Sequence, residues 1–439
     1  MLEPVVNIPM IIPDKAFPGG LGNEAFPSDL FSKERIEAWQ NALNSSFPTV
    51  KDEDWRWTDF KDFPPAVFAV EHREPAVQPR IIETVGSEEI AGSLKIDDSA
   101  VRFFLKEELQ QQGLVFTDLA NALQNEELAK NLVIGKVVNG SEDKFSGMAA
   151  ALAKKGVVLQ VPDGMVIEQP LFSSIQLTDE AGVEATRVLI HIGKFASAKM
   201  ILDFTGGSSG ESLHTGIVEV LLEEGAQLKF SELQETDSSL WQVTRERALI
   251  QKDAKLEWTY GALGTHQSKN FVSVDLTESG AEAHLYGFYF AGSGQRLDLD
   301  TQQNHLAAHT TSNLLFRGAA NGRGQATWEG MIYVDPVAQQ TDAYQSNRNL
   351  MLSEKAEINT IPGLEILAND VRCSHGATVG KLDEDELFYL QCRGIPRAEA
   401  EELMVEAFFS SILDLVPVET VRHHLMDKIK QKFNAERRG

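Results

Sequence analysis

Ala198-Lys199-Met200, Ala226-Gln227-Leu228, Ala254-Lys255-Leu256 and Ala281-Glu282-Ala283 are the stretches that decide the fold. In each, an alanine is followed by a polar residue and then an apolar one, and successive alanines are 28, 28 and 27 residues apart. A fixed period of this size is typical of a solenoid, in which each unit buries its apolar face against its neighbours. A β-sandwich with accidental spacing is the alternative.

The residues around these repeats have the composition of strands. From about residue 156, short runs rich in Val, Ile and Leu are separated by Gly, Asp, Ser and Asn. Examples of these runs are Val157–Val161, Arg187–Ile192, Ile217–Leu222 and Phe271–Leu276. Because no long helical pattern interrupts them, we expect residues 151–381 to form a β-solenoid.

The regions on either side have helical character. Residues 1–150 are expected to form an α-rich domain, with one helix over Phe31 to Ala42, Ser32 as its N-cap, and a helical pattern over residues 105–132. Prolines at 64, 65, 75 and 79 predict an extended connector within this domain. Residues 382–439 are expected to form a C-terminal domain of three helices. The second of these carries an apolar stripe of Ala400, Leu403, Met404, Ala407, Phe408 and Ile412.

The charge and composition exclude several classes of function. The 439 residues carry 65 acidic against 40 basic side chains, a net charge of -25. Such a field repels nucleic-acid phosphates and anionic lipids, so neither a nucleic-acid nor a membrane partner is expected. No run of about 18 apolar residues occurs, and residues 1–13 lack the pattern of a secretory signal. The chain is therefore expected to be cytoplasmic.

Cys373 and Cys392 are the two cysteines of the chain. Two thiols cannot form a disulfide framework, and they cannot supply the four thiolates of a self-contained iron–sulfur site. Any such chemistry would need a second subunit. The sequence also lacks a phosphate-binding loop, which argues against ATP hydrolysis by this chain.

Cys373-Ser374-His375-Gly376 is the notable chemical motif. In a strand, residues two apart point to the same face, and a thiolate with an imidazole suits iron or zinc. A half-buried cysteine beside a hydrogen-bonded histidine is the alternative, and spacing alone favours it. His305 and His309 are four residues apart, but in a strand that spacing does not produce a helical metal site.

Three longer segments resemble the SufB/SufD family of iron–sulfur cluster assembly proteins. These are CSHGATVGKLDEDELFYLQCRGI (373–395), AQQTDAYQSNRNLMLSEKAEINTIPGLEI (338–366) and KFSGMAAALAKKGVVLQVPDGMVIEQPL (144–171). The resemblance implies a right-handed parallel β-helix flanked by N-terminal and C-terminal helical domains. The CSHGAT stretch and the scarcity of cysteine resemble the SufD form more than the SufB form.

The resemblance also implies a function. SufB and SufD pair through their β-helices, and each holds a SufC ATPase through its C-terminal helices. A transient cluster forms at the SufB–SufD interface, and the matching histidine here is His375, with Cys373 beside it. The chain is then expected to be a scaffold rather than an enzyme, with no cluster stably bound when alone.

Leu403, Ala407 and Phe408 are the candidate residues for ATPase docking, although this stripe may instead pack on the β-helix. A homodimer with a storage or regulatory role is one alternative function. A β-helical polysaccharide-active enzyme is another, but it would need clustered acids with a basic residue.

Overall fold

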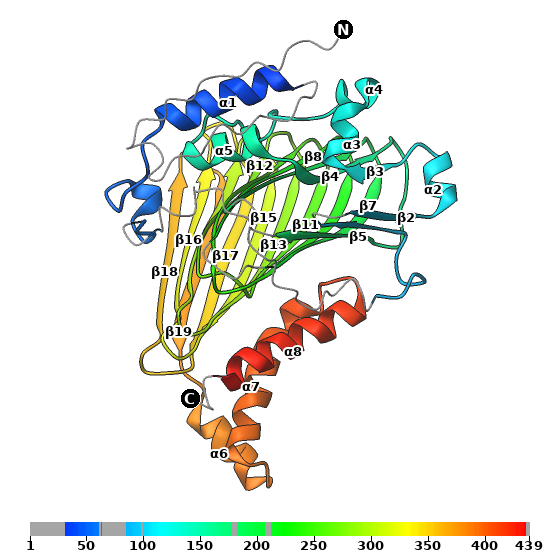
Figure 1. Cartoon of the computed structure of the whole chain (residues 1–439). Coiled ribbons are helices and arrows are strands. Elements are labelled where there is room, and N and C mark those ends of the chain that lie inside the picture. The colour runs from blue at the N-terminus through cyan, green and yellow to red at the C-terminus, as the bar shows by residue number, and fades with distance from the viewer. Residues whose placement is uncertain are drawn as a thin grey trace.

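A computed structural model describes residues 31–60, 63, 85–97, 100–177, 182–206 and 212–435. Figure 1 shows a long β-helix with helices on two opposite sides. The prolines at 64, 65, 75 and 79 and the first 13 residues, which entered the expectations above, lie outside the described residues. Within the described residues, no helix is both long and apolar enough to cross a membrane.

Nineteen named strands, all within the described residues, build the β-helix and its cap. They are β1 (Gly92–Ile96), β2 (Val101–Leu105), β3 (Val115–Asp118), β4 (Lys155–Val161), β5 (Leu171–Leu177), β6 (Val183–Ile192), β7 (Ser197–Gly206), β8 (Ser212–Leu222), β9 (Gln227–Thr236), β10 (Leu240–Ile250), β11 (Lys255–Ala262), β12 (Gln267–Leu276), β13 (Glu282–Ala291), β14 (Arg296–His305), β15 (Thr311–Ala320), β16 (Gln325–Val334), β17 (Thr341–Met351), β18 (Glu357–Ile366) and β19 (Val371–Gly380).

The strands alternate between two sheets along the chain. One sheet has the order β19-β17-β15-β13-β11-β9-β7-β5-β1-β2, and the other has the order β18-β16-β14-β12-β10-β8-β6-β4-β3. From β4 onward every strand pairs in parallel with the strand one turn away. This gives a β-solenoid of about seven turns, and the prediction of that fold is confirmed.

The alanine repeat marks the same corner of successive turns. Ala226, Ala254 and Ala281 immediately precede β9, β11 and β13, occupy equivalent positions and are buried. The first repeat unit was aligned wrongly, because β7 pairs Ala198 with Leu228. The equivalent of Ala226 is therefore Ala196, thirty residues earlier, since this turn is two residues longer than the next.

An antiparallel cap closes the start of the β-helix. β2 pairs with β1, which in turn pairs in parallel with β5, while β3 pairs antiparallel with β4. The helical pattern expected over residues 105–132 was wrong in part. It contains β3 and three short helices, α2 (Glu107–Gln111), α3 (Leu119–Gln124) and α4 (Glu126–Ala129). The packing of β3 on β4 overrides the local helical spacing there.

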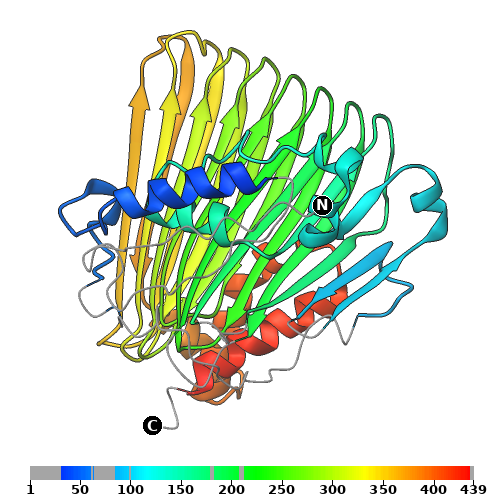
Figure 2. The same cartoon turned by 45° about the horizontal axis from the view of Figure 1, so that its top comes forward.

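The N-terminal helices cover the nine-stranded sheet (Figure 2). They are α1 (Ser32–Asn44) and α5 (Lys144–Leu152), with a short 3-10 turn at Glu53–Trp55 between them in the chain. Trp39, Phe145 and Trp55 pack with Trp241 and Phe271, which point outward from β10 and β12. Since α1 begins at Ser32, its N-cap is Phe31, whose side chain gives no capping hydrogen bond.

The C-terminal helices cover the ten-stranded sheet on the opposite side (Figure 1). They are α6 (Glu384–Cys392), α7 (Arg397–Leu413) and α8 (Glu419–Ala435). Phe409 and Val405 of α7 and Leu425 of α8 belong to one buried cluster with Phe288 and Phe290 of β13. Figure 1 shows α6 projecting away from the sheets.

The interior of the β-helix contains a group of buried polar side chains. Glu232, Gln234, Gln242 and Glu246 point inward from β9 and β10, and all are fully buried or nearly so. The Gln242 amide donates to Gln234 Oε1 at 2.5 Å, which joins the two sheets across the interior. Burial raises the pKa of Glu246 to about 7 and raises that of Glu232 well above its usual range.

Candidate functional site

The last turn of the β-helix ends in two strands that have a neighbour on one side only. Within the described residues, β18 pairs with β16 and β19 pairs with β17, and the chain then leaves for α6. Most residues of both strands are half-buried or exposed. This open end presents unpaired backbone groups, which are a natural template for another chain.

Cys373 and His375 lie on β19 and point toward the interior of this open end. In the register of the ladder, Cys373 stands above Ala343 and His375 above Gln345, and both of these β17 residues are buried inside the β-helix. Cys373 packs against a small buried cluster that includes Ile332, Val334 and Ala368. Side chains in register share a face, so the motif points inward while its last turn leaves His375 exposed.

The Cys373 thiol is poorly prepared to ionise in the isolated chain. Burial raises its pKa, and the nearby negative charge of Asp342 raises it further, against a smaller opposing effect of the Ala343 backbone. Asp342 itself forms an exposed ion pair with Arg372, 3.4 Å between Oδ2 and Nη1. Since the thiolate is the ligand and nucleophile, Cys373 needs a metal ion or a partner cation before it can act.

Apolar side chains surround the motif at the open end. Leu364, Ile366 and Leu367 at the end of β18, and Val379 on β19, are each more than a third exposed. Pro362 lies in the middle of β18, where it removes one backbone donor from the strand. The site is therefore a flat, partly apolar end with an imidazole inside its rim.

His305 and His309 do not form a metal site. His305 is buried, with Nδ1 at 2.7 Å from Thr310 Oγ1 and Nε2 at 2.8 Å from Ser312 Oγ, and burial lowers its pKa to about 4. His309 is an exposed turn residue with a φ of 61°. Among the described residues, no group of three or more His, Cys, Asp or Glu side chains is arranged to hold a metal ion.

The stripe proposed for ATPase docking divides between two environments. Leu403 and Ala407 are exposed on α7, whereas Phe408 is half-buried. The Phe408 ring packs edge-on against Phe409, with 5.0 Å between ring centroids, and the Arg317 guanidinium lies 5.3 Å from its ring centroid. Phe408 therefore holds α7 to the β-helix at least in part, while Leu403 and Ala407 stay accessible.

Two exposed aromatic residues on α6 were missed by the sequence reasoning. Phe388 is 66% exposed and Tyr389 is 58% exposed, although both lie next to the buried Leu387. The signal was present, since the acidic first turn and the capping Asp383 place a helix at this point. Which face α6 buries is a tertiary property that the short apolar run did not reveal.

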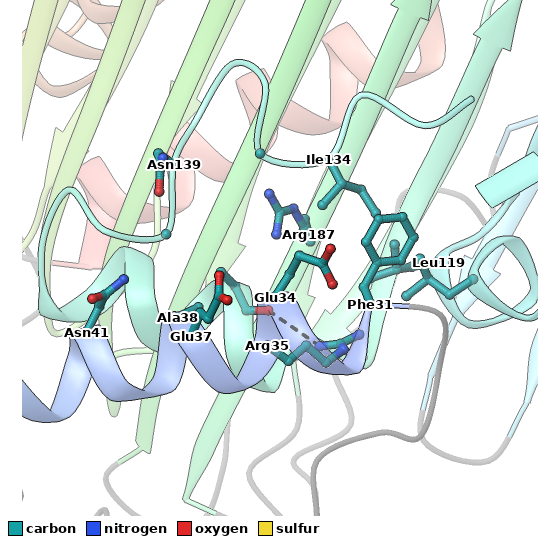
Figure 3. A pocket seen from close by; sticks show the side chains of 14 residues that line it. Phe31, Glu34, Arg35, Glu37, Ala38, Asn41, Leu119, Ile134, Asn139 and Arg187 are labelled. Carbon is teal, nitrogen blue, oxygen red and sulfur yellow. Dashed lines mark hydrogen bonds between the residues drawn. The ribbon is translucent and has the colours of Figure 1, made fainter. Parts of the chain in front are cut away.

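A cavity of about 270 Å³ lies between α1 and the 134–140 segment, far along the chain from the Cys373 motif. Figure 3 shows Glu34, Arg187 and Ile134 around it. Arg187 is already neutralised by Glu219, which accepts from its Nε at 3.0 Å. This cavity was not predicted, and its polar groups serve the packing of α1 on the sheet.

The fold and this end define a class of protein, a β-solenoid scaffold with an accessible terminal turn. Residues 175–408 match the family model described as "SUF system FeS cluster assembly, SufBD core domain", and residues 24–172 match the "SufBD protein N-terminal region". The chain therefore belongs to the SufBD family of iron–sulfur cluster assembly proteins.

Two curated relatives illustrate the match. The iron–sulfur cluster assembly protein SufB of Bacillus subtilis is 27% identical over 328 residues, which cover 74% of this chain and 70% of that protein. A SufBD family protein of iron–sulfur cluster assembly from Staphylococcus epidermidis is 26% identical over 375 residues, covering 82% of this chain and 80% of the relative. The resemblance drawn from the sequence is thereby confirmed at the level of the family.

Proposed function

We propose that this chain is a SufD-type scaffold subunit that supplies His375 to a nascent iron–sulfur cluster held jointly with a SufB-type partner. The observation that carries the proposal is the placement of His375 on the exposed last turn, with Cys373 on the same face of the strand. The cluster is cargo: with two cysteines, this chain cannot complete a four-thiolate site alone.

The open end supports a role in pairing with the partner. β18 and β19 offer free strand edges, and Leu364, Ile366, Leu367 and Val379 add apolar surface beside them. Strand edges with adjacent apolar side chains suit a partner that contributes strands of its own. A partner seated here would cover His375 and exclude water from the shared site.

The imidazole suits a cluster that must leave again. A neutral imidazole is a ligand for iron, and one histidine holds a cluster less firmly than a full thiolate set. His375 either ligates iron directly or relays a proton to the sulfide or thiolate of the partner's half of the site. Cys373 joins as a second ligand or sulfur acceptor once it is ionised.

The projecting side of the C-terminal helices is proposed as the dock for a SufC-type ATPase. Phe388, Tyr389, Leu403 and Ala407 are exposed there, and Phe408 supports them from below. Exposed aromatic side chains that gather at one place are typical of protein interfaces. We further propose that the complex works in the cytoplasm and that this subunit performs no catalytic turnover itself.

A homodimer is the second candidate, because the same open end offers a self-complementary strand edge. In that case the chain would serve storage or regulation until a SufB-type partner displaced the second copy. The two candidates differ in whether His375 meets a partner's cysteine or a second His375.

Co-expression with SufB-type and SufC-type subunits tests the proposal. After anaerobic purification, we expect His375→Ala to leave the complex assembled but to lower its iron and sulfide content severely. His423→Ala is the matched control, since His423 is an exposed histidine on α8. Normal cluster content in the His375→Ala complex, and normal supply to cluster-dependent enzymes in cells, would reject the site assignment.

A further inference from the structure

Gln345 occupies the interior position directly beneath His375. The two residues are register partners on β17 and β19, which pair in parallel. Neighbouring strands lie about 4.8 Å apart, and residues in register point to the same face. The carboxamide of Gln345 and the imidazole of His375 are therefore stacked neighbours inside the end of the β-helix.

The carboxamide of Gln345 is held in one orientation. Its Nε2 donates to the carbonyl oxygen of Gly330 at 3.2 Å and to that of Gly363 at 3.0 Å, on β16 and β18 of the opposite sheet. Gln345 is fully buried. Both amide protons are thus used across the interior, and the position of the carbonyl oxygen Oε1 is fixed as a consequence.

Gly330 makes room for this arrangement. A Cβ at Gly330 would lie 2.6 Å from Gln345 Oε1 and 2.3 Å from the ring of Trp328. Any larger residue would displace the carboxamide. The opposite sheet is therefore shaped to admit the Gln345 head group.

Oε1 of Gln345 is a buried acceptor with no hydrogen-bond partner among the described residues. A buried unpaired acceptor is costly, and such atoms in folded proteins usually have a partner to find. The Gln345 carboxamide has used its donors, so Oε1 requires an N–H or O–H group. The imidazole one strand away can offer an N–H by turning about its Cβ–Cγ bond.

We propose that Gln345 is a positioning residue, whose Oε1 accepts the ring N–H of His375 and leaves the other ring nitrogen free to meet iron. This inference rests on the proposed function of His375. A histidine that binds a metal ion usually donates its second N–H to an oxygen, which fixes the tautomer and the ring orientation. Here the oxygen is supplied by a neutral side chain, so no charge is added to the interior.

Two substitutions at Gln345 separate positioning from packing. Gln345→Met keeps the approximate volume but removes the acceptor oxygen. Gln345→Glu keeps an oxygen acceptor but loses the amide donors to Gly330 and Gly363. Asn349→Leu is the matched control, because Asn349 is a buried polar residue on the same strand and face but lies under Val379.

The first measurement is made on the purified full chain with ¹⁵N-labelled histidine at pH 8, where imidazoles are neutral. His375 is assigned by its loss in His375→Ala. In the unchanged chain and in Gln345→Glu we expect two well-separated ring ¹⁵N shifts, the signature of one tautomer. In Gln345→Met the two shifts should move toward each other, while Asn349→Leu leaves them unchanged.

The second measurement is the cluster content of the complex assembled with both partner subunits. Gln345→Met is expected to lower it about tenfold, the usual effect of removing such a partner, and Gln345→Glu is expected to restore most of it. Unchanged shifts in Gln345→Met would overturn the proposal. Equal losses in Met, Glu and the Asn349→Leu control would also overturn it, since that result indicates packing alone. The ¹⁵N result does not depend on whether His375→Ala affects cluster assembly, so the two proposals fail separately.

Discussion

Arg187 on β6 and Glu219 on β8 form a buried ion pair, with 2.5 Å between Nη2 and Oε1. The same carboxylate accepts backbone N–H groups from Gly135, Val137 and Val138, at 3.1, 3.0 and 3.2 Å. One side chain thus ties the segment before α5 to the outer face of the nine-stranded sheet. The N-terminal segment is attached by charge as well as by apolar packing.

Glu219→Gln is expected to destabilise the chain by about 3 kcal/mol, because it leaves the Arg187 charge buried without a counter-charge. The measurement is the shift of the urea unfolding midpoint. Glu223→Gln provides the control, since Glu223 pairs with His191 where both side chains are about a quarter exposed. If both variants unfold at the same urea concentration, the buried pair does not stabilise the fold.

Glu246 and Glu232 are expected to make the chain less stable as the pH rises. Burial holds the pKa of Glu246 at about 7, whereas an unfolded glutamate ionises near pH 4.3. Between these values the folded state keeps protons that the unfolded state has released. Stability from this source is complete below about pH 4 and is lost as the pH passes through about 7. His214 and Tyr260, which face the pair from β8 and β11, stay neutral because burial lowers the histidine pKa to about 3 and raises the tyrosine pKa.

Glu246→Gln removes one of these ionisable groups while keeping its shape. Relative to the unchanged chain, the variant should gain stability at pH 8 and little or none at pH 5. The gain is expected to be about 2 kcal/mol, since each unit of pKa shift corresponds to about 1.4 kcal/mol. Thermal unfolding at the two pH values measures it. A stability difference that does not change between pH 5 and pH 8 would contradict the assignment.

The turns of the fold were predictable because the repeat is a local property. A small residue is needed at the corner before β9, β11 and β13, and alanine appears there with a nearly constant period. The glutamates at 232 and 246 gave no such signal. Their inward direction depends on the register of each strand, and acidic residues in a strand are ordinarily read as solvent-facing.

The candidate site was only partly predictable for a similar reason. The spacing of Cys373 and His375 indicated one face of one strand, but not whether that face is inside or outside the β-helix. Gln345 carries no motif and becomes visible only through its register with His375. The antiparallel cap made by β1, β2 and β3 was also missed, because tertiary pairing overrides the helical spacing of residues 105–132.

Cys373 is expected to react more slowly with iodoacetamide than Cys392 in the metal-free chain. Cys392 is exposed, whereas Cys373 is half-buried and its pKa is raised by burial and by Asp342. The thiolate is the reacting form. Mass spectrometry of both cysteine peptides at pH 8 measures the two rates in one sample. Asp342→Asn should speed up Cys373 and leave Cys392 unchanged, and faster labelling of Cys373 in the unchanged chain would contradict this account.

The final prediction concerns Phe388, which is two-thirds exposed on a helix that projects from the β-helix (Figure 1). Phe388→Ser removes a large apolar contact without touching the buried Leu387, so the fold should be unaffected. If α6 and the start of α7 dock the ATPase subunit, binding should weaken at least tenfold, as expected for an aromatic residue central to an interface.

Leu415→Ser is its matched control, because Leu415 is a comparably large exposed side chain beyond the end of α7. Titration of the purified ATPase subunit onto each variant gives the dissociation constants. Leu403→Ser should weaken binding together with Phe388→Ser, since both would lie under one partner. Tight binding to Phe388→Ser and Leu403→Ser alike would place the dock elsewhere on the chain.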